Sequence, residues 1–187
     1  MSCRTLILNL LALGLSLVST SAGAAEITAE KRDSGVVVRI DGQPFTTYVV
    51  DSGLEPKLGP ILWPIIGPTG KPVTRAHPMA KGPNERQDHP HHRSLWFNHG
   101  DVNGLSFWHV DRIRHREFVK VESGPEAVIV TRNDWISPAG KNVCEDERRL
   151  TFGLDGDARR IDFDITLTAG ADAVTFGDTK EGTTGCL

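Results

Sequence analysis

The residues best suited to chemistry lie in one short block, residues 88–104, which reads DHPHHRSLWFNHGDVNG and holds four of the seven histidines. On an extended chain, residues two positions apart point to the same side. This spacing predicts that His89 and His91 share one side and that Asp88 and His92 share the other. Imidazoles and carboxylates are the usual acid–base groups near neutral pH, and both are ligands for zinc, iron, copper or manganese.

A second pair with the same spacing, His99 and Asp101, follows within the block. The candidate catalytic groups are therefore His89, His91, His92, His99 and Asp101. If a metal is bound, its expected ligands are His89, His91 and His99. No cofactor is predicted, although a transition metal stays possible. A glutamate placed as in a cupin is missing after the His-x-His pair, and no Cys-x-x-Cys spacing exists. A structural hydrogen-bonding corner and adventitious metal affinity are the alternatives.

Aromatic and polar side chains accompany the histidines. Flat indole rings pack on the C–H faces of sugars, and Arg, Asn and Asp can orient sugar hydroxyls. The expected substrate-binding residues in and beside the block are Arg93, Asn103, Trp96 and Trp108. The alternative is that the tryptophans are core residues.

The segment Gly177–Gly182, GDTKEG, is compact and polar. It lacks the spacing of a phosphate-binding loop. Asp178, Lys180 and Glu181 are additional candidates for substrate binding, and a solvated surface network is the alternative.

Several short strands must position these groups. Two β-branched runs, residues 36–40 and 45–50, flank Asp41-Gly42 and predict a hairpin. Further strands are expected near 117–121, 127–131 and 161–167, with turns at 137–140 and 155–157 and a last short run at 174–176. The charged stretch 142–152 fits either a helical turn or a strand face. The pattern predicts an all-β protein, an antiparallel β-sandwich.

A proline-rich region, residues 56–90, separates the two groups of strands and holds eight of the eleven prolines. Neither a helix nor a central strand tolerates that density. Ile61, Leu62, Trp63, Ile65 and Ile66 are large apolar residues within it. The region is therefore predicted to be a long, ordered, functional loop.

The N-terminal residues 1–25 resemble a cleavable signal peptide, with Arg4, an apolar run from Leu6 to Val18 and the small-residue motif Ala22-Gly23-Ala24. Residues 26–187 then form the sandwich domain, in the periplasm or outside the cell. No later segment is apolar enough to span a membrane. Cys144 and Cys186 could form one disulfide, but two unpaired thiols are favoured. The formal net charge of −3 disfavours nucleic-acid binding.

Four motifs, residues 67–75, 88–97, 99–104 and 176–182, resemble the PmoA-like family, exported bacterial proteins labelled "methane oxygenase PmoA". The resemblance runs from about Tyr48 to Gly182. It implies a β-sandwich akin to the galactose-mutarotase group and sugar-related work. Similar proteins continue well beyond the Asp-Thr-Lys-Glu-Gly segment, so the resemblance also implies that the sandwich is incomplete at its C-terminus.

The leading hypothesis is thus an exported carbohydrate-active protein with isomerase, epimerase or lyase chemistry at the histidine block. A carbohydrate or other small molecule is the expected partner, and the oligomeric state stays open. The alternatives are a metal-dependent oxidoreductase, as the family label suggests, a non-catalytic binding module, and an inactive truncated product.

Overall fold

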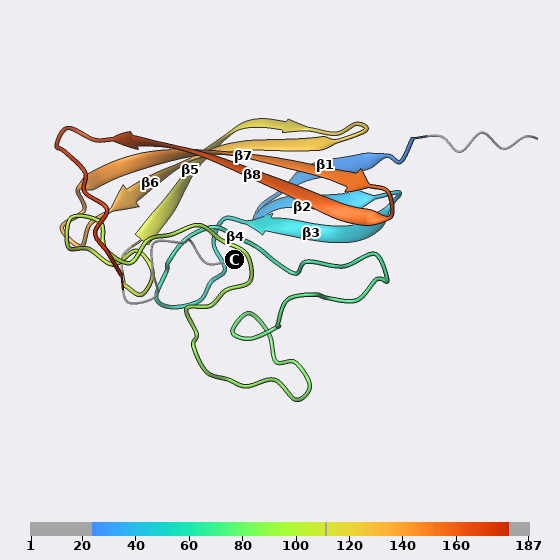
Figure 1. The fold of residues 1–187 in the computed structure, drawn as a ribbon, viewed down its shortest axis with the longest axis horizontal. Helices are drawn as coiled ribbons and strands as arrows, with labels where there is room; N and C mark the ends of the chain where they lie inside the picture. Colours follow the sequence, from blue (N-terminus) through green and yellow to red (C-terminus); the bar gives the residue numbers. More distant parts are fainter. Residues whose placement is uncertain (1–23, 111, 180–187) are drawn as a thin grey trace, which may run out of the picture.

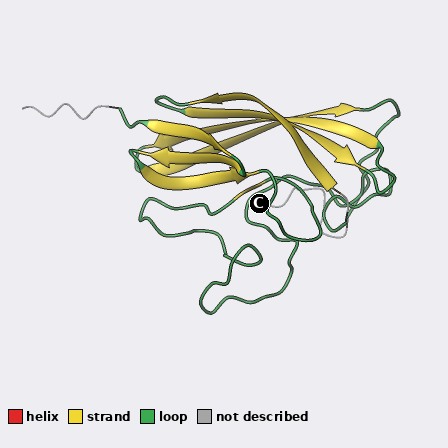
Figure 2. Ribbon diagram, turned by 180° about the vertical axis from the view of Figure 1, so that it is seen from behind, coloured by secondary structure: helices red, strands yellow, loops and turns green. Residues whose placement is uncertain are grey.

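Two antiparallel sheets of four strands build the part of the molecule that the structure describes. The computed structural model describes residues 24–110 and 112–179, in which every regular element is a strand (Figures 1 and 2). One sheet has the order β1-β2-β3-β4 and the other the order β5-β6-β7-β8. The strands are β1 (Ile27–Arg32), β2 (Gly35–Ile40), β3 (Gln43–Val49), β4 (Ile61–Leu62), β5 (Arg112–Glu122), β6 (Ala127–Ile136), β7 (Asn142–Asp155) and β8 (Ala158–Ala169). The predicted all-β, sandwich-like architecture is confirmed.

The small sheet is organised by the predicted hairpin. Asp41 and Gly42 both have positive φ, 48° and 74°, as the tight turn between two right-twisted strands requires. The inward-facing Val36, Val38 and Phe45 are buried against the large sheet. β1, which the sequence patterns did not reveal, completes this sheet beside β2.

The large sheet is a meander whose turns lie at the predicted positions, between β6 and β7 and between β7 and β8. The ambiguous charged stretch is part of β7, so the helical alternative is wrong. Alternation along β7 turns Glu147 and Arg149 to solvent and buries Cys144, Asp146 and Arg148. Asp146 and Arg148 are thus charged side chains on the inward face of the sheet.

A buried ion pair occupies the space between the sheets. The Arg148 guanidinium donates through Nε to Asp146 Oδ1 and through Nη2 to Asp146 Oδ2, both at 2.9 Å. Asn133 Nδ2 and Trp135 Nε1 donate to the same carboxylate at 2.6 and 2.7 Å. Burial alone would lower the pKa of Arg148, but the Asp146 carboxylate raises it above its ordinary value. Four hydrogen bonds thus satisfy a fully buried carboxylate, as a charge at such a place requires.

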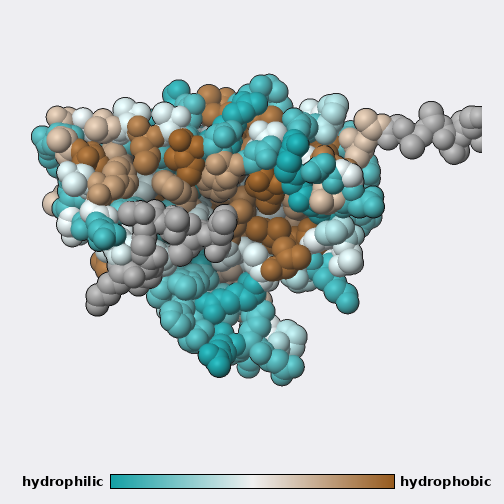
Figure 3. Space-filling view, in the orientation of Figure 1, coloured by the Kyte–Doolittle hydropathy of each residue, from teal (hydrophilic) through white to brown (hydrophobic). Residues whose placement is uncertain are grey.

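The proline-rich region is a loop layer beside the sandwich, as predicted, and contains only the two-residue strand β4 (Figure 1). Its apolar anchors Leu58 and Ile61 are buried with Trp96 and Trp108 in a separate core cluster. Figure 3 shows a hydrophilic surface over the part of this layer that projects from the sandwich. The layer is therefore held by an apolar base and presents polar groups outward.

The predicted last run, residues 174–176, forms only an isolated bridge, between Phe176 and Val102. Residues 1–23, which hold most of the expected signal peptide, lie outside the described residues. The described part of the chain contains no helix long and apolar enough to cross a bilayer.

Candidate functional site

A turn, and not an extended segment, brings the predicted histidines together. His92 N donates to His89 O at 2.9 Å, and His89 has a φ of 48°. Because the chain reverses here, His89, His91 and His92 converge, and the predicted separation of His92 from the other two is wrong. Pro90 at the second position of the turn suits this reversal, because its ring fixes φ near the value required there.

A fourth imidazole, that of His109, joins these three. We call His89, His91, His92 and His109 the imidazole cluster. The ring centroids of His91 lie 4.5 Å from His109 and 4.6 Å from His92, and His89 lies 5.2 Å from His92. His109 was not predicted, because it lies outside the dense block. The turn closed by the Val110 N to Ser106 O hydrogen bond places it there.

Trp108 forms the floor beneath the cluster. Its indole is almost parallel to the His109 ring, at 5.8 Å and 12°, and lies 6.2 Å from His91 and 6.0 Å from His92. The indole is otherwise buried, and its Nε1 is a buried donor that has no hydrogen-bond partner among the described residues. The predicted contact of Trp108 with the histidine site is present, with the ring below the imidazoles and not as an exposed wall.

The electrostatics of the cluster favour the neutral forms of His91 and His92. Partial burial, together with the neighbouring His109, His92 and His89, lowers the pKa of His91 to about 4. Burial also lowers the pKa of His92, with additional effects of His89 and Arg75 that outweigh the opposing Asp88. At neutral pH both rings therefore keep a lone pair that can accept a proton or a hydrogen bond.

Arg75, a residue that sequence reasoning did not single out, holds the turn in place. Its Nη2 donates to the backbone carbonyls of Asp88 and His89 at 2.8 and 2.7 Å, and its Nη1 donates to Asp88 Oδ1 at 3.1 Å. The other carboxylate oxygen of Asp88 lies 3.2 Å from His89 Nδ1. Burial alone would raise the pKa of Asp88, but Arg75 and His89 lower it. Asp88 is thus held as a carboxylate, which can orient the His89 ring.

His99 and Asp101 meet at a different place, around Gly177. His99 Nε2 lies 2.9 Å from Gly177 O, and Gly177 N donates to Asp101 O at 2.8 Å. A Cβ at Gly177 would lie 2.2 Å from Asp101 Oδ2, so only glycine permits this approach. Asp101 Oδ1 accepts from Gly104 N at 2.9 Å. His99 and Asp101 therefore both contact the Gly177 backbone, His99 through its ring and Asp101 through its own carbonyl.

The Gly177 segment and the imidazole cluster lie close to the same tryptophan. A Cβ at Gly100 would lie 3.0 Å from Thr179 Cγ2 and 3.9 Å from Trp108 Cε3. The indole is thus approached by His91, His92 and His109 and also by the chain next to His99.

The remaining polar candidates have mixed placements. Asn103 uses its whole amide as an anchor, because Nδ2 donates to Ala173 O and Oδ1 accepts from Thr175 N. Asp178 is exposed and accepts from Thr179 N. Lys180 and Glu181 lie outside the described residues, so their predicted roles stay predictions.

Two predicted substrate-binding residues are buried in the fold. The Arg93 side chain is only 1% exposed and donates to the backbone carbonyls of Pro90 and Pro56. Trp96 is 4% exposed and packs in the apolar base of the loop layer. Both therefore position the loop that carries the cluster and present no surface to a sugar, which corrects the roles expected for them.

The histidines expected as metal ligands do not form one group, since His99 bonds to Gly177 O and the other two lie in the imidazole cluster. Within residues 24–110 and 112–179, no set of three or more His, Cys, Asp or Glu side chains has the arrangement of a metal site. Cys144 is a buried free thiol, and Cys186 lies outside the described residues.

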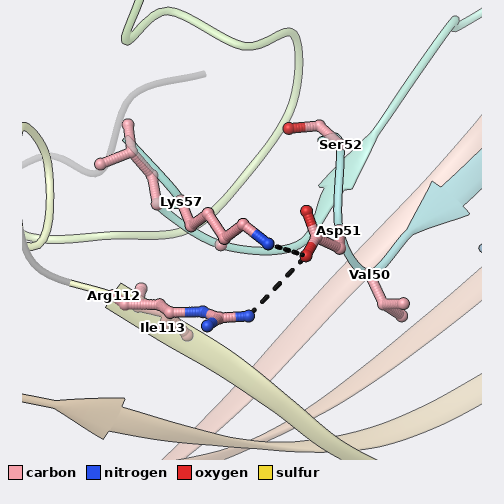
Figure 4. Close-up of a pocket in the computed structure, with 8 residues that line it drawn as sticks. Val50, Asp51, Ser52, Lys57, Arg112 and Ile113 are labelled. Atoms are coloured by element: carbon pink, nitrogen blue, oxygen red, sulfur yellow. Dashed lines mark hydrogen bonds and ion pairs between the residues drawn. The ribbon is translucent and has the colours of Figure 1, made fainter. Parts of the chain in front are cut away.

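A small pocket between the loop layer and β5 contains none of the predicted residues (Figure 4). Asp51 Oδ2 lies 3.2 Å from Lys57 Nζ and 3.8 Å from Arg112 Nη2 at its mouth. Its volume of about 10 Å³ is enough for about one water molecule. The side chains here pair with one another, so the imidazole cluster is the better candidate site.

Comparison with known proteins adds a family to this geometry. No curated protein and no solved structure matches the chain. The model of DUF6807, described as a family of unknown function, matches residues 35–186, a range that includes the small-sheet hairpin, the loop layer and the whole large sheet. The chain therefore belongs to the DUF6807 family.

Proposed function

We propose that this chain is an exported carbohydrate-active protein in which the imidazole cluster supplies the acid–base groups for isomerisation, epimerisation or elimination on a sugar. The observation that carries the proposal is the convergence of four imidazoles, three of which lie beside Trp108, with the pKa of His91 lowered to about 4. An imidazole cluster in which His91 and His92 are neutral, beside an aromatic floor, is a proton-transfer site that also offers an apolar contact.

The acid–base step follows from the separation of the rings. A neutral His91 can accept a proton from the carbon beside a sugar carbonyl or from a hydroxyl group. The His92 and His109 ring centroids lie within 4.6 Å of it, so the proton taken up by His91 can return to an adjacent atom of the same substrate from His91 itself or after transfer to a neighbouring imidazole. Asp88, held by Arg75, orients the His89 ring for the same purpose.

The substrate class is supported by the surroundings of the cluster and by the resemblance to PmoA-like proteins. The surface over the loop layer is hydrophilic (Figure 3), which suits a polyhydroxylated ligand. Trp108 supplies the flat apolar face that sugar C–H groups prefer. Export through the signal peptide at residues 1–25 is part of the proposal, because such a protein would meet sugars outside the cytoplasm.

The proposal is tested by NMR of the imidazole carbons while neutral sugars and keto-sugars are added one at a time. A ligand is expected to shift the resonances of His91, His92 and His109 and to change the fluorescence of the protein. The variant His91→Gln should weaken binding at least tenfold. Arg86→Gln, which changes an exposed residue of the same loop, should bind as the wild type does.

The absence of any response to every sugar, with the strand signals of the fold intact, would overturn the proposal. Stoichiometric uptake of a transition metal on the cluster without a sugar response would also overturn it, in favour of metal-dependent chemistry. If His91→Gln and Arg86→Gln weakened sugar binding equally, the imidazole cluster would not be the binding site.

A further inference from the structure

The outer strands of the two sheets differ in how well their edges are protected. β4 has only two residues, and β1 is bridged to Gly124 through Ile27. β5 carries two register shifts against β6 and many charged residues. Short edges, bulges and charges are the devices by which proteins prevent edge-to-edge pairing. Three of the four outer strands therefore have a recognisable protection.

β8 is neither short nor bulged, and its four charged residues all lie in its first seven positions. Its twelve residues pair with β7 from Ala158 to Ala169 without a register shift. Among the described residues, no strand pairs with its outer edge. Figure 1 shows β8 starting at the turn beside β2 and β3 and running back along the whole large sheet. A long, regular edge of this kind presents a row of backbone donors and acceptors to a further strand.

The apolar face of β8 extends beyond the shared core. Ile161 and Phe163 pack against the core between the two sheets. Ile165 is only partly buried, and Leu167 is 39% exposed. All four lie on the same face as the buried Leu150 and Phe152 of β7, because they are opposite inward-facing residues in the antiparallel register. A strand added beside β8 would therefore extend the apolar face as well as the sheet.

The β8 sequence is complementary to a second copy of itself in one register. With a two-fold axis through Ile165, Phe163 lies opposite the partner's Leu167, so the apolar side chains stay on one face. On the other face, Asp164 lies opposite the partner's Thr166 and Asp162 opposite the partner's Thr168. The overlap covers residues 161–169, and no charge faces a like charge.

Other registers that also keep the apolar and polar side chains of β8 on separate faces are less favourable, because they place like charges opposite each other or shorten the overlap. An axis through Asp164 sets two Asp164 carboxylates opposite each other. An axis through Phe163 sets Asp162 opposite the partner's Asp164 twice. Like charges that are directly opposite destabilise a strand pair. An axis through Thr166 avoids these clashes but shortens the overlap to residues 163–169.

We propose that the outer edge of β8 is a homodimer interface, in which two copies pair antiparallel about Ile165 and join their large sheets into one continuous sheet of eight strands. The contact is isologous, so it closes after two copies and leaves no free β8 edge for further growth. The proposal is independent of the activity proposed above, because it uses no residue of the imidazole cluster.

The mass of the protein in solution tests the interface, measured by sedimentation or light scattering over a range of concentrations. The wild-type chain is expected to be dimeric. Ile165→Lys places two ammonium groups opposite each other at the axis and should give a folded monomer. Val119→Lys makes the same change at a side chain that is 48% exposed on the other outer strand of the large sheet, and it should leave the dimer intact.

A cysteine pair tests the register and does not depend on the folding of the lysine variant. In a background with Cys3→Ser and Cys186→Ser, Ile165→Cys should form an intermolecular disulfide under mild oxidation, because directly opposite Cα atoms lie about 4.5–5.5 Å apart. Thr168→Cys, opposite the partner's Asp162, should not. A wild-type monomer at every concentration, a dimer that survives Ile165→Lys, or cross-linking at Thr168→Cys but not at Ile165→Cys would overturn the proposal.

Discussion

The buried pair of Asp146 and Arg148 gives a sharp test of what stabilises this sandwich. The side-chain accessibility of both residues is 0%, and the carboxylate accepts four hydrogen bonds from Asn133, Trp135 and Arg148. Asp146→Asn keeps the shape of the side chain but replaces one acceptor oxygen by a donor. The amide group would then face donors that can no longer be satisfied, and the guanidinium would lose its counter-charge.

The expected loss is large. A buried donor left without an acceptor costs about 1–3 kcal/mol, and removal of one partner from a buried ion pair costs about 3–5 kcal/mol. We therefore expect Asp146→Asn to lower the free energy of unfolding by about 3–5 kcal/mol. A domain has a total stability of only about 5–15 kcal/mol, so the variant should be close to the limit of folding.

Urea unfolding followed by tryptophan fluorescence measures this loss, because Trp135 is one of the donors to the carboxylate. The matched control is Glu145→Gln on the same strand. The Glu145 carboxylate pairs with Arg116 near the surface, so the control should change stability by at most about 1 kcal/mol.

A second variant separates the cost of an unpaired charge from the value of the pair. The double replacement Asp146→Leu with Arg148→Met should recover only part of the loss, because apolar residues can replace a buried ion pair without cost but the Asn133 and Trp135 donors lose their acceptor. A loss below about 1 kcal/mol for Asp146→Asn, or equal losses for Asp146→Asn and Glu145→Gln, would refute the reasoning.

Three further results are expected. The pKa of His91 is lowered from 6.5 to about 4, so between these pH values the unfolded chain binds more protons than the folded chain, and the melting temperature should fall as the pH decreases through this window. His91→Gln should flatten that part of the pH profile. A profile that His91→Gln leaves unchanged would contradict this assignment. Burial raises the pKa of the Cys144 thiol to about 12, so peptide mapping should find this thiol unmodified by thiol reagents in the native protein and modified after unfolding. Labelling of Cys144 in the native protein would show that the thiol is accessible and would contradict its burial. In Gly35→Ala, the new Cβ would lie 1.8 Å from Tyr48 O at a φ of +150°, so urea unfolding should show that the free energy of unfolding falls by about 3 kcal/mol or more. Gly42→Ala, whose Cβ would meet no atom within 4 Å at a positive φ, should lower it by only about 1 kcal/mol. Equal losses in the two variants would exclude the steric explanation.

The sequence predicted the features that depend on neighbouring residues. Alternation identified β8, the Asp41-Gly42 turn identified the β2–β3 hairpin, and proline density identified the loop layer. Each of these patterns acts within a few residues, so it is visible without knowledge of the fold. The residues of the histidine block could be recognised by type for the same reason.

The tertiary structure decided which of those residues meet. His91 approaches His109 because two separate turns bring their segments over Trp108, and no spacing along the chain predicts that contact. Arg93 has the same charge as Arg75, yet one is buried against backbone carbonyls and the other clamps the cluster. Only the long-range packing of the loop layer on the sandwich distinguishes these roles, because burial and hydrogen-bond partners depend on what lies opposite a side chain and not on what precedes it.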